Sequence, residues 1–190
     1  MDNNEIKELL KTRLDEKRFS HSLCVADEAV RLAKIYGANE DEAYFSGLVH
    51  DITKNASDDE HLKLFHSFDI ILSDIELHKN KLWHAISGSV YVKNILNIDN
   101  EDIINAVRYH TTARANMSKL EKVVYLADFT SADRTYGDVD IMRRLVEVSM
   151  EDAMTYSLSY IIGELIKSRS PIHPDTLAAY NEVILKQERS

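Results

Sequence analysis

Residues 18–37 read RFSHSLCVADEAVRLAKIYG, with no proline and with one glycine, at the end of the stretch. Its apolar residues recur at helical spacing: Leu23, Ala26, Val30 and Ala33. This spacing predicts a helix from about residue 20 to residue 36 with one buried face. Gly37 follows the last apolar turn, where glycine commonly ends a helix.

The rest of the chain shows the same pattern, interrupted by one polar stretch. Asn100 precedes two acidic residues, Ser118 and Glu121 match a capping box, and Pro174 suits a first helical turn. Residues 55–80 are polar and predict short helices joined by loops. The patterns outside this stretch predict further helices over about residues 6–14, 41–51, 82–96, 101–110, 120–130, 149–167 and 174–186.

The scarcity of residues that break helices supports an all-α fold. The 190 residues include 5 glycines and 2 prolines. A β-rich or Rossmann-type protein needs many tight turns, which usually use these residues, and no glycine-rich phosphate loop occurs. We therefore expect one all-α domain over residues 1–190, in which helices over 138–187 pack on a core of about residues 18–135.

Charge and cysteine content exclude several classes of protein. The net charge is −9, which argues against broad nucleic-acid binding, because that requires a basic surface. Apolar stretches are broken before about 18 residues, and the N-terminal MDNNEIKELLKTRLDE lacks a signal-peptide core, so we expect a cytoplasmic protein that does not bind membranes. The single cysteine, Cys24, excludes an internal disulfide and a cysteine-based zinc cluster.

The histidines differ in how strongly their surroundings indicate a functional role. Three lie in the polar stretch beside charged residues, and we expect them to be solvated: His61, His66 and His78. Four others lie in or end apolar helical stretches: His21, His50, His84 and His110. One such histidine alone would most often be a core residue satisfied by a hydrogen bond. Four of them on four predicted helices, with acids nearby, indicate a shared role.

Two aspartates follow apolar runs and raise the problem of a buried charge. Asp128 ends the run VVYLAD, and Asp51 follows GLVH. A buried carboxylate without a partner costs several kcal/mol or becomes protonated, so each requires a cation. An N-cap or a salt bridge from elsewhere in the fold would satisfy a single aspartate, whereas metal ions among the histidines would satisfy both.

The adjacent pair His50-Asp51 limits how a metal could bind. Consecutive residues on a helix point about 100° apart. The two side chains therefore fit one metal where the helix ends, or where Asp51 bridges two metals. Imidazole and carboxylate ligands without thiolate suit iron, manganese, nickel or zinc. Two such ions would polarise a phosphoryl oxygen and generate hydroxide at neutral pH.

The order and the flanks of these residues resemble a known family. HD-domain metal-dependent phosphohydrolases, an all-α superfamily, show the same ordered set: His21, His50, Asp51, His84, His110 and Asp128. The flanking words are similar to those of YqeK-type symmetrical bis(5′-nucleosyl)-tetraphosphatases: RFSHSLCVADEAVRLAKIYG, GLVHDITKN, YHTTARANMSKLEKVVYLAD and SPIHPDTLAAYNEV. The likeness spans about residues 18–181, and the ordered set is far more specific than the HD dipeptide alone.

The resemblance implies a binuclear iron centre. One metal would be held by four residues: His21, His50, Asp51 and Asp128. Asp51 would bridge to a second metal, completed by His84 and His110. The implied reaction is hydrolysis of diadenosine tetraphosphate to two ADP, with metal-bound hydroxide attacking a phosphorus of the chain.

The resemblance also assigns residues to the substrate. Lys54, in HDITK, would lie against the phosphates and act with Asp51 in catalysis. The other implied contacts are Arg18, Thr111 and Arg134 near the phosphates, and Ile172 and His173 near the nucleoside. Two metal ions together with these cations would make the site locally positive despite the acidic surface.

The chain departs from the family pattern at two places. Relatives commonly read HTTG where this chain reads HTTA, with Ala113 in the place of glycine. They commonly read ADxxEPxR where this chain reads ADFTSADR, with Ser131-Ala132 in the place of glutamate and proline. Ala113 would be strained if its backbone adopts an angle open only to glycine. Two alternatives therefore stay open: an HD phosphohydrolase of a deoxynucleoside monophosphate or guanosine polyphosphate, and a non-catalytic nucleotide sensor. A homodimer also stays open.

Overall fold

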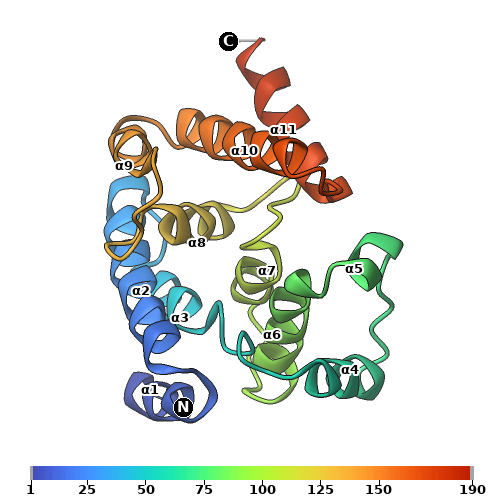
Figure 1. The fold of residues 1–190 in the computed structure, drawn as a ribbon. Helices are drawn as coiled ribbons and strands as arrows, with labels where there is room; N and C mark the ends of the chain where they lie inside the picture. Colours follow the sequence, from blue (N-terminus) through green and yellow to red (C-terminus); the bar gives the residue numbers. More distant parts are fainter. Residues whose placement is uncertain (1, 189–190) are drawn as a thin grey trace.

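The computed structural model of the protein describes residues 2–188. Within this range the chain forms eleven α-helices and one 3-10 helix, with no β-strand, so the all-α prediction is confirmed (Figure 1). The elements are α1 (Asn3–Arg13), α2 (Glu16–Tyr36), α3 (Glu40–Val49), α4 (Asp58–Ser67), α5 (Asp74–His78), η1 (Asn80–Leu82), α6 (Trp83–Asn94), α7 (Glu101–Tyr109), α8 (Lys119–Thr130), α9 (Val139–Val148), α10 (Met150–Lys167) and α11 (Pro174–Gln187). No helix among the described residues has the length and apolarity to cross a membrane.

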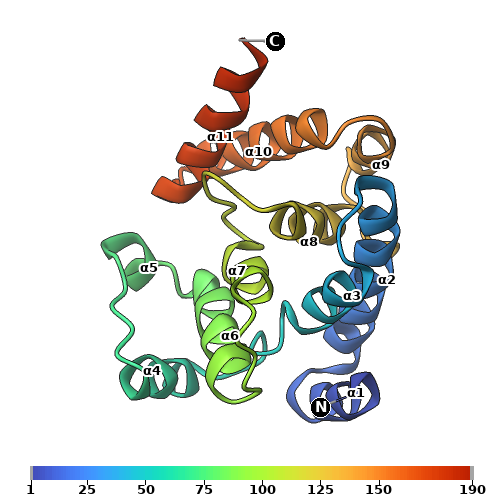
Figure 2. The same cartoon turned by 180° about the vertical axis from the view of Figure 1, so that it is seen from behind.

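Five helices make up the middle of the molecule: α2, α3, α6, α7 and α8. Helices α2 and α3 pack together on one side, α6 and α7 on the other, and α8 contacts both α2 and α7 (Figures 1 and 2). Helix α10 crosses over α8 and also packs against α9 and α11. Helices α4 and α5 form an arm beside α6.

One apolar cluster connects these helices. It extends from Ile6 and Leu10 in α1, through the fully buried Leu126 in α8, to Leu158 in α10 and Val183 in α11. The C-terminal helices therefore share a core with the helices that carry His21, His84 and Asp128. A smaller cluster of Phe65, Trp83 and Ile86 lies between α4 and α6.

Helix boundaries follow the local signals in the sequence. Gly37 ends α2 in the left-handed conformation with φ +67°. Ser118 and Glu121 form the reciprocal capping box of α8, which satisfies two backbone N–H groups. Asn100 caps α7, and Pro174 is the first residue of α11. These predicted boundaries are confirmed.

Gly47 sets the close packing of α2 and α3. A Cβ atom at this position would lie 2.8 Å from Ala26 Cα and 3.0 Å from the Val25 carbonyl oxygen. Any side chain here would force the two helices apart, because the obstructing atoms belong to the backbone. The close approach brings His21 and His50 together, with ring centroids 5.3 Å apart.

The predicted surface position of His61 is wrong. This side chain is 5% exposed, and its Nδ1 lies 2.8 Å from the hydroxyl of Ser87 in α6. Helix α4 is amphipathic: its acidic residues face outward while His61 and Phe65 lie on the inner face. The polarity of the neighbouring residues therefore did not indicate the side chain's own burial. His66 and His78 are exposed as predicted.

Candidate metal centre

Four imidazole rings surround the Asp51 carboxylate where α2, α3, α6 and α7 meet. The ring Nε2 atoms of His84 and His110 lie 3.2 and 3.5 Å from Asp51 Oδ1, and that of His50 lies 3.4 Å from Oδ2. His21 on α2 packs against His50 from the other side. None of the five side chains is more than 4% exposed. Residues separated by up to 89 positions in the sequence thus share one buried site.

Helix ends explain how adjacent residues reach the same point. Helix α3 ends at Val49, so His50 and Asp51 lie in the turn that follows it. His50 still has helical backbone angles, but the turn then continues with hydrogen bonds between residues three apart, from Ile52 N–H to Val49 and from Lys54 N–H to Asp51, so the α-helical pattern ends at this pair. His110 likewise follows the last residue of α7.

The turn after α7 contains Ala113, for which the sequence analysis predicts strain if its backbone adopts an angle that favours glycine. Ala113 has φ +55° and is fully buried. The left-handed conformation costs an L-residue about 1–2 kcal/mol, and burial of its methyl group offsets roughly 0.8 kcal/mol of that. The fold therefore accepts alanine at this left-handed position.

Each of the four rings is fixed in place through Nδ1. Three rings donate to the backbone carbonyl three residues earlier, at 2.7, 2.8 and 2.7 Å: His50 to Gly47, His84 to Lys81 and His110 to Val107. His21 Nδ1 lies 2.8 Å from Asp133 Oδ2. Carbonyl and carboxylate oxygens only accept hydrogen bonds, so Nδ1 carries the hydrogen in each ring. In the neutral rings the lone pair is consequently on Nε2, which faces the centre.

Several atoms that face the centre have no hydrogen-bond partner. They are His21 Nε2, His50 Nε2 and Asp51 Oδ1, all buried. His84 Nε2 and His110 Nε2 lie 3.2 Å apart, which places two lone pairs against each other in the neutral rings. Leaving such groups unsatisfied costs about 1–3 kcal/mol each. A cation that accepts these lone pairs would remove that cost.

The donor atoms form two groups that share one aspartate. His21, His50 and Asp51 offer atoms within 4.8 Å of one another, and so do Asp51, His84 and His110. Nitrogen and carboxylate donors without thiolate suit divalent transition metals. The residues therefore fit a metal centre, and the sharing of Asp51 fits two adjacent ions.

Asp128 borders the first group and also pairs with a cation of the chain. Its Oδ1 lies 3.0 Å from His21 Nε2, and Arg134 binds both its carboxylate and its backbone carbonyl. Burial favours the protonated form, but the contact with His21, the nearby His50 and the positive charge of Arg134 hold the pKa of Asp128 far below its usual range. The carboxylate is thus charged and directed at the centre.

Two more cations border the Asp51 carboxylate. Arg18 Nη1 lies 2.7 Å from Asp51 Oδ2, and Lys54 Nζ lies 3.8 Å from Oδ1 and 3.1 Å from His84 Nε2. Burial lowers the pKa of Lys54. The structure therefore brings together the predicted phosphate contacts Arg18, Lys54 and Arg134 around the two carboxylates.

The protonation states suit metal binding. Burial favours protonation of Asp51, but His50, His110 and His84 hold its pKa well below the usual range. Burial lowers the pKa of His84 to about 4, against the pull of Asp51 in the other direction. At neutral pH Asp51 is an anion and His84 a neutral ring, which are the forms that bind metals.

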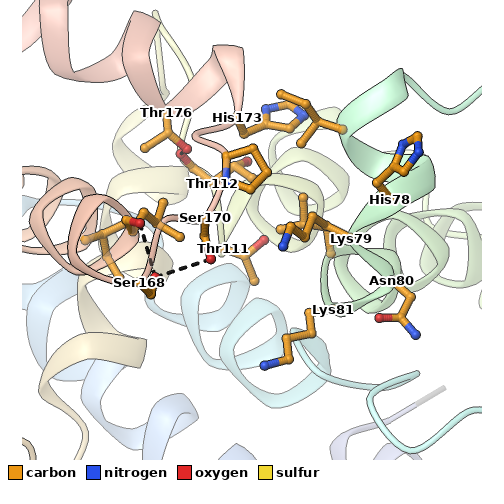
Figure 3. A pocket seen from close by; sticks show the side chains of 15 residues that line it. His78, Lys79, Asn80, Lys81, Thr111, Thr112, Ser168, Ser170, His173 and Thr176 are labelled. Carbon is orange, nitrogen blue, oxygen red and sulfur yellow. Dashed lines mark hydrogen bonds between the residues drawn. The ribbon is translucent and has the colours of Figure 1, made fainter.

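A cavity of about 580 Å³ is lined by residues close in sequence to two of the histidines, Thr111 after His110 and Leu82 before His84. Thr111, Lys79, Lys81 and His173 are among its lining residues (Figure 3). His173 also caps α11, because its Nδ1 accepts the backbone N–H of Asp175. Of the predicted nucleoside contacts, His173 therefore lines a cavity, whereas the half-buried Ile172 is outside that lining.

Asp133 is a residue of the site that the sequence analysis did not single out. Its Oδ2 accepts from His21, and its Oδ1 accepts from the Ser131 hydroxyl at 2.8 Å. Ser131 is itself fully buried. The stretch that departs from the family pattern thus contains a hydrogen-bonded chain that orients a histidine. The sequence contained one signal for this role: an acidic residue next to Arg134, in the stretch that departs from the family pattern.

We expect Asp133→Ala to weaken metal binding by about 10–100-fold, because an unheld imidazole loses both its orientation and its tautomer. Competition with a coloured chelator measures this affinity. Asp133→Asn keeps an acceptor oxygen and should lose less, and Asp140→Ala, at an exposed position of α9, is the matched control. Equal affinities for Asp133→Ala and the wild type would contradict the orienting role.

The fold and the site together define an all-α protein with a buried histidine–aspartate metal centre. Residues 18–133 match the family model of the HD domain. The symmetrical bis(5′-nucleosyl)-tetraphosphatase of Halalkalibacterium halodurans is 36% identical over 99% of this chain and 100% of its own length. The enzyme of that name from Bacillus subtilis is 32% identical over 97% and 98%.

A solved structure is equally similar. The crystal structure of a protein from Clostridium acetobutylicum, described as a predicted HD superfamily hydrolase involved in NAD metabolism, has a TM-score of 0.94 and 34% identity, covering 98% of each chain. The chain therefore belongs to the HD domain family and, within it, to the family of the symmetrical bis(5′-nucleosyl)-tetraphosphatases.

Proposed function

We propose that this protein hydrolyses diadenosine tetraphosphate symmetrically, giving two molecules of ADP. The names of the relatives support the substrate and the reaction. The observation that carries the proposal is the arrangement of four Nδ1-anchored imidazole rings around one charged, shared carboxylate. Such an arrangement is built for metal ions rather than for core packing, because packing alone would not leave the inward-facing atoms unsatisfied.

Two metal ions are proposed for this site, with iron as the physiological metal. The proposed ligands of the first are His21, His50, Asp51 and Asp128. The proposed ligands of the second are Asp51, His84 and His110. When bound, such ions supply Lewis acidity toward a phosphoryl oxygen and make a water nucleophilic at neutral pH.

The cations around the centre are proposed to bind the polyphosphate. Arg18 and Arg134 already pair with the carboxylates, so their guanidinium groups lie at the rim of the centre. Lys54 Nζ lies between Asp51 and His84, and burial lowers its pKa. Its ammonium group is therefore a stronger acid than in water, which suits neutralising the phosphate oxygen that leaves.

Thr111 is proposed to add an uncharged donor. Its hydroxyl is buried without a hydrogen-bond partner, although the residue lines the cavity beside the centre. A phosphate oxygen at that place would accept this hydrogen bond. The contact would help to hold the phosphates in one position relative to the metal centre. That position determines which phosphate bond is hydrolysed.

The products test the proposal directly. One water adds to a central phosphorus, the bond from that phosphorus to the central bridging oxygen breaks, and the second ADP departs with that oxygen. The expected products are ADP alone, with ¹⁸O from labelled water in the terminal phosphate of half of the ADP molecules. Chromatography and mass spectrometry measure both. Formation of ATP with AMP would exclude symmetrical cleavage, and binding without turnover would favour the sensor alternative.

A further inference from the structure

A second cavity, of about 310 Å³, adjoins the centre. His110 and Asp128 line it, and its remaining wall includes three aromatic side chains: Phe129, Tyr136 and Tyr160. The aromatic residues come from α8, the loop after it and α10, so they meet only in the folded chain. The volume falls at the lower end of the range of small-molecule sites, about 300–1,000 Å³.

The two cavities are neighbours beside the metal centre, and the smaller one contains the ligand candidates His110 and Asp128 in its lining. Thr111 and Ile161 line both of them. The larger cavity extends from these residues toward Lys79, Lys81 and His173, and the smaller one toward Tyr136. A long ligand that passes Thr111 can therefore occupy both cavities, and in the smaller one it lies against His110 and Asp128.

The wall of the smaller cavity is chemically unlike that of the larger one. The rings of Tyr136 and Tyr160 lie 5.4 Å apart at 38°, and Phe129 stands perpendicular to Tyr136 at 6.3 Å. The Tyr136 hydroxyl donates to the Phe129 carbonyl at 3.1 Å, which fixes its ring. All three rings are only half-buried. Held but incompletely covered aromatic faces suit stacking with a flat heteroaromatic ring.

The charged groups of this cavity are already balanced. Asp128 is the acid among its lining residues, and Arg134 binds that carboxylate. A neutral base therefore meets no unpaired anion there. Burial raises the pKa of Tyr136, so its hydroxyl stays protonated at physiological pH.

We propose that the aromatic cavity formed by Phe129, Tyr136 and Tyr160 binds the second nucleobase of a dinucleoside polyphosphate. This inference rests on the proposed function. The first base occupies the larger cavity, the tetraphosphate crosses the centre, and the second base stacks on Tyr160 and Tyr136. A chain of phosphates held at both ends presents its middle to the metal centre, which accounts for cleavage into equal halves.

Tyr160→Ala tests the inference, because this side chain is remote from the metal ligands in sequence and lies on another helix. Loss of a stacking face should raise KM for diadenosine tetraphosphate by about 5- to 150-fold and leave kcat within about threefold. The dissociation constant of an analogue with a methylene group in place of the central bridging oxygen should rise equally. Calorimetry measures that constant without turnover.

Adenosine 5′-tetraphosphate, which has one base, provides the discriminating ligand. Its base can occupy the larger cavity, so Tyr160→Ala should change its dissociation constant by no more than about twofold. Tyr160→Leu, which keeps an apolar side chain of useful size, should behave like Tyr160→Ala and guards against a folding defect. Tyr156→Ala, one turn earlier on α10 and outside the cavity lining, is the matched control and should match the wild type with both ligands.

The outcomes separate this inference from the proposed function. Equal weakening of the one-base and two-base ligands, or no weakening of either, would overturn the second base site even in an enzyme that produces ADP. Absence of hydrolysis by the wild type would overturn the proposed function, while the calorimetric comparison would still decide the base site. Selective weakening of the two-base ligand supports it.

Discussion

Asp51→Asn is expected to lower kcat/KM for diadenosine tetraphosphate at least about 1,000-fold and to remove most of the bound metal. The amide has nearly the shape of the carboxylate but lacks its charge. Because Asp51 belongs to both donor groups, one substitution weakens both. Activity assays and elemental analysis of the purified variant measure the two effects.

The helices should survive this substitution. Asp51 lies in the turn after α3, and its backbone contributes to no helix interior. The variant should therefore keep the circular dichroism of the wild type. Arg18 loses the charge that it binds at 2.7 Å, so a modest decrease in thermal stability of the metal-free protein is expected.

The control is the same change at an exposed position of a helix that carries a ligand. Asp27→Asn on α2 should keep full activity and full metal content. An Asp51→Asn enzyme with wild-type activity and metal content would show that Asp51 is not a shared ligand.

Removal of the metal should abolish activity and lower Tm by about 8–16 °C. A ligand present at about 1,000 times its Kd stabilises the native state by about 4 kcal/mol. In a chain of this length each kcal/mol corresponds to about 2–4 °C. Dialysis against a chelator, followed by assay and calorimetry, measures both changes.

The metal-free protein should nevertheless remain folded. Asp51 and Asp128 each retain a guanidinium partner, Arg18 and Arg134 respectively. Their charges are therefore compensated without an ion. Addition of ferrous iron, manganese, nickel or zinc under anaerobic conditions should restore activity to different extents and so identify the competent metal.

The Asp51→Asn variant serves as the reference for this experiment, since its Tm should not respond to the chelator. If the chelator changed neither activity nor Tm of the wild type, the histidine–aspartate cluster would have to act without metal. A shift of Tm without loss of activity would assign the ions a structural role only.

Much of the site was predictable because its residues break local rules. His21, His84 and His110 interrupt apolar helical faces, and Asp51 and Asp128 end apolar runs. A charged or polar group at such a position needs a partner, so the sequence alone shows that a partner must exist. The polar stretch was less informative, and His61 shows the reason: burial of a side chain on an amphipathic helix depends on which face meets α6.

The sequence by itself determined the helices, their capping residues and the set of candidate metal ligands, because propensity, capping and periodicity act over a few neighbouring residues. Tertiary structure alone decided that Asp133 holds His21, that Arg18 binds Asp51, and that Phe129, Tyr136 and Tyr160 enclose a second cavity. These contacts depend on how distant helices pack. Gly47 is an example: because it lacks a Cβ atom, α2 and α3 can pack closely, and this close packing assembles the site.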